Sequence, residues 1–171
     1  MFDLPRSSHP HLRPLLDACI ERFQLDLHGD HGPRHWLRVH HNALLIAEAE
    51  DVDPFLPGCF ALLHDSCRVD EFHDSGHGSR AAEFAVELRT RGALPPMSEP
   101  DFELLQLACR YHSGRISDGP RIARVCWDAD RLDLPRVGIE PVPERLCTGF
   151  ARLPSTIRAA RERALGSDWV D

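Results

Sequence analysis

Apolar residues recur along the chain at intervals of three and four positions, and no run of β-branched residues looks like a strand. This spacing predicts helices over seven segments: 11–26, 33–50, 55–66, 78–91, 99–112, 119–132 and 154–165. Glycine and proline mark the breaks between them, for example at Gly32-Pro33, Asp53-Pro54 and Pro95-Pro96. The pattern therefore predicts an all-α protein, a compact helical bundle of about six to seven helices.

The length of 171 residues suits one globular domain, so we expect residues 1–171 to form a single domain with one site. Residues 149–171 carry the least information and are expected to form a peripheral helix. No apolar stretch approaches the roughly 18 residues of a membrane span, and residues 1–10 lack the features of a signal peptide. We expect a cytoplasmic protein without a membrane partner.

Composition narrows the chemistry further. All 20 basic residues are arginines, which excludes Schiff-base chemistry and a P-loop lysine, and the net charge of −7 argues against a stable nucleic-acid surface. The 6 cysteines form no C-x-x-C pair, so a reduced compartment and core positions are expected rather than a thiolate zinc site. The 11 histidines are unusually many, and histidine is the commonest metal ligand. The candidate site is therefore sought among them.

Several of these polar residues lie on the apolar rows of the predicted helices. His35 shares a row with Val39, Ala43 and Ile46, and His64 and Asp65 each follow an apolar residue by four positions. Leu104 and Ala108 precede His112 in the same way, as Ala123, Cys126 and Trp127 precede Asp130. Each unpaired buried polar group costs about 1–3 kcal/mol, so these side chains need a shared partner. A transition metal bound by imidazoles and carboxylates from facing helices is such a partner.

The motifs around these residues resemble the HD-domain superfamily. The first is His35-Trp36-Leu37-Arg38-Val39, the second is the doublet in His64-Asp65-Ser66-Cys67-Arg68, and the last is Asp128-Ala129-Asp130-Arg131-Leu132-Asp133. The resemblance spans about residues 28–147, and its four-part order is more specific than the His-Asp dipeptide alone. It implies an α-helical HD-type fold and, most often, metal-dependent hydrolysis of phosphate esters or nucleotides.

By position, the resemblance implies that His35, His64, Asp65 and Asp130 are metal ligands. Asp128 is the rival for the last place, although the inward row favours Asp130. Some relatives add two histidines and hold two metals, and His77 and His112 match that order, with His73 as a competitor for the third place. The expected cofactor is therefore one or two ions of Mn, Fe, Co, Ni or Zn.

The resemblance also implies the roles of the remaining residues. The metal would activate a water and polarise the phosphoryl oxygen, Asp65 would steer that water, and Arg68 would bind a phosphate oxygen of the small phosphorylated substrate or nucleotide. His31 is a candidate substrate contact or proton donor, Asp133 a candidate partner of a metal-bound histidine, and Arg115 and Arg131 are weaker phosphate candidates.

Two other functions stay open from the sequence alone. Some two-metal relatives resemble di-iron oxygenases with the same ligand set, although the absence of lysine favours hydrolysis. A non-catalytic nucleotide-binding HD domain is the third alternative, and the complete ligand set argues against it.

Overall fold

The computed structural model describes residues 4, 11–114 and 118–166. Over these residues the chain forms seven α-helices and two short 3₁₀ helices and no strand, so the predicted all-α class is confirmed. The helices are α1 (Leu12–Arg22), α2 (Pro33–Ala49), α3 (Phe55–Leu63), α4 (His77–Thr90), α5 (Glu99–Tyr111), α6 (Arg121–Arg131) and α7 (Pro154–Leu165), with η1 (Leu134–Val137) and η2 (Pro143–Arg145) between the last two.

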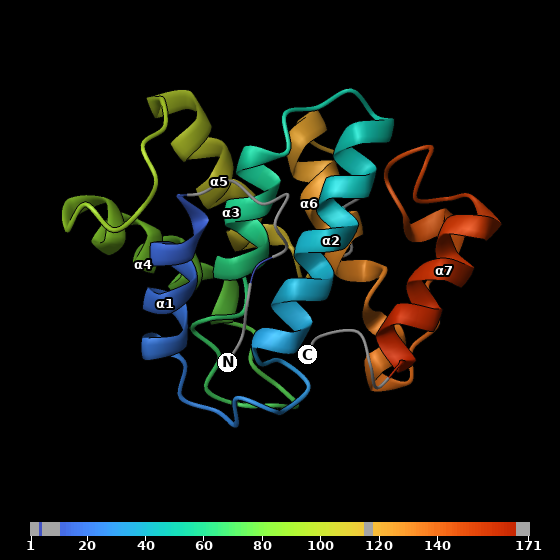
Figure 1. The fold of residues 1–171 in the computed structure, drawn as a ribbon, viewed down its shortest axis with the longest axis horizontal. Coiled ribbons are helices and arrows are strands. Elements are labelled where there is room, and N and C mark those ends of the chain that lie inside the picture. The colour runs from blue at the N-terminus through green and yellow to red at the C-terminus, as the bar shows by residue number, and fades with distance from the viewer. Residues whose placement is uncertain (1–3, 5–10, 115–117, 167–171) are drawn as a thin grey trace.

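Helix α3 is the centre of the arrangement because it is apolar on every side. All eight residues from 56 to 63 are buried, and the helix contacts α1, α2, α4, α5 and α6. A helix without a polar face must be covered all round by its neighbours. Figure 1 shows α2, α3 and α6 in the middle of the molecule, with α7 on one side and α1, α4 and α5 on the other.

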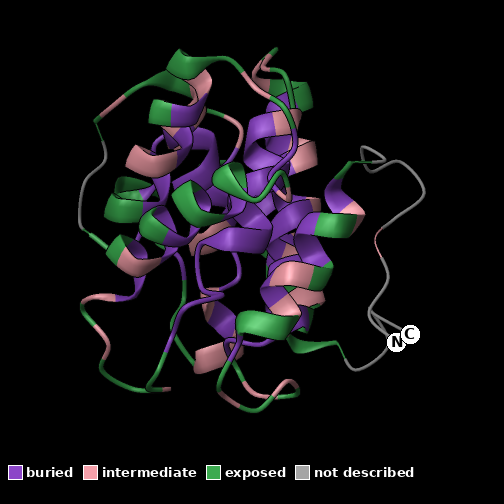
Figure 2. Cartoon of the chain, turned by 90° about the vertical axis from the view of Figure 1, so that its left-hand side faces the viewer, coloured by how far each residue is buried: buried purple, intermediate pink, exposed green. Residues whose placement is uncertain are grey.

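The other helices bury one face each, and the buried positions gather where the helices face one another (Figure 2). On α2 the predicted row of His35, Val39, Ala43 and Ile46 is fully buried. On α5 the predicted Ala108 and His112 are buried, whereas Leu104 is only partly buried and its neighbour Leu105 is buried instead. The helical spacing therefore predicted the inward faces of these two helices closely.

Several helix boundaries differ from the sequence prediction, most of them by one residue, and the larger differences lie at the ends of α1 and α3 and at the start of α6. Helix α1 ends at Arg22 rather than at residue 26, since Phe23 takes an extended conformation and sets its ring against Trp36 with centroids 5.2 Å apart. Helix α6 begins at Arg121 rather than at 119, since Pro120 is extended at the helix N-cap. The two 3₁₀ helices were not predicted, and both line the cavities described below.

Candidate metal centre

Four helix ends bring four histidines together at the C-terminal end of α3. His35 comes from the first turn of α2 and His64 caps the C-terminus of α3, while His77 opens α4 and His112 caps the C-terminus of α5. Asp65 follows His64 directly, and Asp130 lies in the last turn of α6. The six residues predicted as metal ligands therefore meet at one place, although nothing in their sequence separations requires it.

Each imidazole is fixed by a hydrogen bond from its Nδ1 atom. His35 donates to Asp133 at 2.7 Å, His64 to the carbonyl of Ala61 at 3.0 Å, His112 to the carbonyl of Cys109 at 2.6 Å, and His77 to the carbonyl of Asp74. Because a neutral imidazole carries one proton, a proton held on Nδ1 leaves a lone pair on Nε2. All four rings thus present an Nε2 acceptor to the same interior space.

These Nε2 atoms face one another in two pairs. The Nε2 atoms of His35 and His64 are 3.0 Å apart, and those of His77 and His112 are 2.8 Å apart. Two lone pairs at such a distance repel unless a proton or a metal cation lies between them, and imidazole nitrogen is a good ligand for transition metals. The donor set therefore fits a transition-metal site.

Asp65 connects the two halves. Its Oδ2 lies 3.5 Å from His35 Nε2 and 3.7 Å from His64 Nε2, and its Oδ1 lies 3.3 Å from His77 Nε2 and 3.6 Å from His112 Nε2. The first half has a second carboxylate, because Asp130 Oδ1 lies 3.4 Å from His35 Nε2 and 3.7 Å from His64 Nε2. Asp65 therefore offers one carboxylate oxygen to each pair of histidines.

Ligand atoms within 4.8 Å of one another define two groups among the described residues. The first group is His35, His64 and Asp130, and the second is His64, Asp65 and His112. Both groups belong to the cluster described above. Its imidazoles and carboxylates match the ligand preferences of first-row transition metals.

The charges of the cluster are set by burial and by mutual contact. Burial alone raises the pKa of Asp65 and Asp130, but the adjacent histidines more than offset it and hold both pKa values well below the usual range. Burial and the charge of His112 lower the pKa of His77 to about 4. Burial and Arg136 also disfavour the charged form of His35, yet hydrogen bonds to three aspartates raise its pKa to about 9. Near neutral pH His35 thus carries a second proton, on Nε2, which a bound metal ion would replace. The centre therefore combines ionised carboxylates with imidazoles, as metal binding requires.

Asp133 orients His35 from behind. Besides the contact with His35 Nδ1, its carboxylate accepts hydrogen bonds from Arg38 Nε at 2.7 Å and from Arg38 Nη2 at 3.0 Å. The carboxylate is buried, so this ion pair fixes both the rotamer and the tautomer of His35. The structure thus places Asp133 where the sequence predicted a supporting carboxylate, and it gives Arg38 of the first motif a position beside it.

Two rivals for ligand positions lie elsewhere. Asp128 is buried and accepts hydrogen bonds from the backbone of Cys147 and from the backbone and hydroxyl of Thr148, so it ties α6 to the segment after η2. His73 is exposed, and its backbone amide bonds to Asp70. The geometry brings Asp130 and His77 to the cluster instead.

A cavity of about 830 Å³ opens over the cluster, and two arginines line it together with acidic and histidine side chains. Arg68 Nη1 lies 3.5 Å from Asp65 Oδ1 and 3.4 Å from His77 Nε2. Arg136, from η1, also lines this cavity and is held by the carbonyls of Asp30 at 2.8 Å and Asp133 at 3.1 Å. Sequence reasoning missed Arg136, because its segment shows no helical periodicity or motif that points to the site.

His31 lies in the same cavity and is held by Glu71. Its Nδ1 contacts the Glu71 carboxylate, its backbone carbonyl accepts a hydrogen bond from Trp36 Nε1 at 2.8 Å, and its ring is nearly buried. Burial lowers the pKa of His31, while Asp65 and Glu71 act in the opposite direction. With Nδ1 committed to Glu71, the Nε2 atom is left for a group inside the cavity.

Arg131 and Arg115 are the weaker candidates for a phosphate contact. The guanidinium of Arg131 connects two segments of the chain, because it donates hydrogen bonds to the carbonyls of Arg145 at 2.9 Å and Gly114 at 3.2 Å. Arg115 lies outside the described residues. The two arginines at the cluster are therefore Arg68, which was predicted, and Arg136, which was not.

Comparison with known proteins reveals one solved structure with this arrangement of helices. It is a crystal structure of a predicted HD superfamily hydrolase from an uncultured Thermotogales bacterium, 28% identical, with a TM-score of 0.67 over 88% of this chain and 85% of that one. This chain is therefore similar to the HD superfamily in fold, in sequence and in its His and Asp cluster. The resemblance seen in its motifs is thereby confirmed, and the HD fold explains why histidines from four helices meet at one centre.

The other comparisons add no family detail. No protein-family model matches the sequence. No curated protein matches it either. The HD assignment rests on the fold, on the identity to the Thermotogales structure and on the His and Asp groups that could hold a metal ion.

The helices of the described residues include none with both the length and the hydrophobicity to cross a membrane.

Proposed function

We propose that this HD protein is a metal-dependent phosphohydrolase that acts on a small phosphorylated molecule or nucleotide. The observation that carries the proposal is the shared cavity: Arg68 and Arg136 line the same space as the His and Asp cluster. A phosphoryl group there would meet two guanidinium groups and the metal ligands at once. The hydrolase description of the Thermotogales neighbour supports the same class of reaction.

The ligand assignment is part of the proposal. One half of the centre would use His35, His64 and Asp130, and the other His77 and His112, with Asp65 contributing one oxygen to each half. The contacts of Asp65 with all four Nε2 atoms support this division. A transition metal bound there supplies Lewis acidity towards the phosphoryl oxygens and lowers the pKa of the attacking water.

The remaining residues of the chain would position the substrate and move a proton. Arg68 and Arg136 offset the negative charge on the phosphoryl oxygens, which is the main demand of phosphoryl transfer. His31, oriented by Glu71 at Nδ1, presents Nε2 to the substrate, and only its doubly protonated form would donate a proton from Nε2 to the leaving oxygen. Asp133 and Arg38 keep His35 in a single tautomer throughout.

The test combines metal analysis with a substrate panel. Purified protein loaded with Mn²⁺, Co²⁺ or Ni²⁺ should release phosphate from at least one phosphate monoester or nucleotide, and His64→Ala should abolish both this activity and metal binding. His73→Ala is the matched control, because His73 is exposed and lies outside the cluster. Iron in the purified protein together with O₂ consumption, and no phosphate release from any compound, would instead identify an oxygenase. A melting-temperature shift with nucleotide but no turnover would identify a binding domain.

Arg136 offers a second test of the phosphate contact. Arg136→Gln removes a charge-assisted hydrogen bond worth about 1.5–3 kcal/mol, so kcat/KM should fall about 10-fold to 100-fold while metal content is retained. Arg136→Lys keeps the charge and should recover part of the loss. Arg13→Gln, which breaks an exposed pair on α1, should change neither quantity. Unchanged kinetics in Arg136→Gln would contradict the phosphate role.

A further inference from the structure

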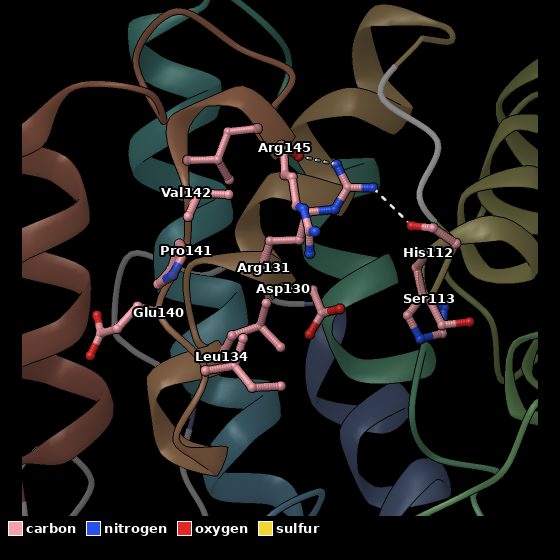
Figure 3. A pocket seen from close by; sticks show the side chains of 12 residues that line it. His112, Ser113, Asp130, Arg131, Leu134, Glu140, Pro141, Val142 and Arg145 are labelled. Carbon is pink, nitrogen blue, oxygen red and sulfur yellow. Dashed lines mark hydrogen bonds between the residues drawn. The ribbon is translucent and has the colours of Figure 1, made fainter.

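A second cavity, of about 430 Å³, adjoins the metal centre on the side of η1 and η2. It shares five lining residues with the larger cavity, so the two spaces meet at the cluster: His112, Ser113, Asp130, Leu134 and Ile139. Figure 3 shows Asp130 between Leu134 on one side and His112 and Ser113 on the other. A molecule with its reacting atom at the centre could therefore extend into both spaces.

The walls of the two cavities differ in chemistry. The larger one is strongly polar: Asp26, Asp30 and Glu71 line it, and Arg68 and Arg136 next to the cluster offer two guanidinium groups to an anion. Away from the centre, the smaller one is lined mainly by apolar side chains: Leu134, Ile139, Pro141, Val142 and Leu146. Organic groups are bound by such walls through burial of apolar surface.

The charged residues of the smaller cavity do not change this character. The guanidinium of Arg131 lies 3.7 Å from the carboxylate of Asp128 and donates to two backbone carbonyls, and Glu140 is paired with Arg161 at 2.9 Å. Arg145 is exposed, so its charge can stay hydrated at the rim. The wall next to Asp130 therefore offers mainly shape and apolar contact, and Arg145 is the one arginine lining it that has no ion pair among the described residues.

We infer that the substrate is a phosphate monoester with an uncharged, largely apolar or aromatic body, seated in the cavity between the end of α6 and η1–η2. The phosphoryl group lies against Arg68 and Arg136, and the organic group extends past Asp130 towards Leu134 and Val142. This inference rests on the proposed phosphohydrolase function and adds the chemical class of the leaving group. It disfavours polyol phosphates, whose hydroxyl groups would lose their hydration against an apolar wall.

The first arm of the test measures binding without turnover. Phenylphosphonate and methylphosphonate share the anionic head and differ in the body, and neither contains the ester bond that is cleaved. Metal-loaded protein should bind phenylphosphonate at least about tenfold more tightly in calorimetry, which is about 1.4 kcal/mol. Equal affinity for the two compounds would overturn the inference, whatever the enzyme hydrolyses.

The second arm alters the cavity. Val142 is 41% exposed and lines only the smaller of the two cavities, so Val142→Asp should fold and should reduce the tenfold preference to less than about threefold. Leu153→Asp is the matched control, since Leu153 is 46% exposed and lines neither cavity, and the preference should persist there. Metal content measured on both variants checks that the centre is intact. A preference that survives Val142→Asp would also refute the assignment.

The third arm separates this inference from the proposed function. 2-Phenylethyl phosphate and glycerol 3-phosphate are offered as substrates, since both release a primary alcohol. The value of kcat/KM should be at least about tenfold higher for the phenylethyl ester because its ring is buried in the cavity. If neither ester is hydrolysed but phenylphosphonate binds with the Val142-dependent preference, the cavity assignment stands and the hydrolase proposal falls. If both esters are hydrolysed equally well, the hydrolase proposal stands and the apolar-body inference falls.

Discussion

Replacing Asp133 with asparagine should weaken metal binding without touching a proposed ligand. The carboxylate accepts three hydrogen bonds, from His35 Nδ1 at 2.7 Å and from Arg38 at 2.7 and 3.0 Å. An amide has only one acceptor oxygen, so in Asp133→Asn its NH₂ group must face either the imidazole N–H or the guanidinium. His35 then loses the fixed tautomer that directs its Nε2 lone pair into the cluster.

The magnitude follows from the contacts that are lost. Loss of the partner behind a metal-bound histidine typically costs 10-fold to 100-fold in metal affinity, or about 1.4–2.8 kcal/mol. The same change leaves the nearly buried Arg38 charge without its partner, and breaking a buried pair costs about 3–5 kcal/mol of stability at most. We therefore expect a weaker metal Kd together with a lower Tm.

The control separates these two effects. Asp128 is also a buried carboxylate at the end of α6, but it bonds to Cys147 and Thr148 rather than to a histidine. Asp128→Asn should lower Tm by a comparable amount and leave the metal Kd nearly unchanged, as measured by competition with a chelator on folded protein. Equal metal Kd values for wild type and Asp133→Asn, or a weaker Kd in Asp128→Asn alone, would refute the reasoning.

Three further predictions concern the second half of the centre and the core. His77→Ala should lower the metal content by about one atom per chain in elemental analysis, whereas His73→Ala should leave it unchanged; equal contents in both variants would remove His77 from the ligand set. Gly78→Ala should destabilise the fold and also reduce metal content, because an added Cβ would lie 2.4 Å from the backbone carbonyl oxygen of Cys109, where α4 meets α5. Gly149→Ala is the control: its Cβ would meet only an ordinary 3.7 Å contact, so thermal melts should change little. Burial lowers the pKa of His40 to about 4, below the unfolded value of about 6.5, so the unfolded state binds the proton more readily and the free energy of unfolding should fall by up to about 3 kcal/mol as the pH drops from 6.5 to 4. His40→Leu should flatten that part of the denaturation profile, and an unchanged slope would contradict the assignment.

Much of the fold was predictable because helices depend on local spacing. The apolar row through His35 on α2, the predicted bounds of α7 and the fully apolar α3 all follow from residues close together in the sequence. The end of α1 was not predictable in this way. Phe23 leaves helical geometry to pack on Trp36, a partner 13 positions away that periodicity does not reveal.

The sequence by itself determined the helical class and the order of His and Asp residues from which the HD superfamily was inferred. Tertiary structure decided which of them meet: Asp130 rather than Asp128, and His77 rather than His73. It also brought Arg136 to the cluster, a contact between distant segments that leaves no local pattern. The physical reason is that backbone preferences act over a few residues, whereas the direction of a buried side chain depends on which helices pack together around α3.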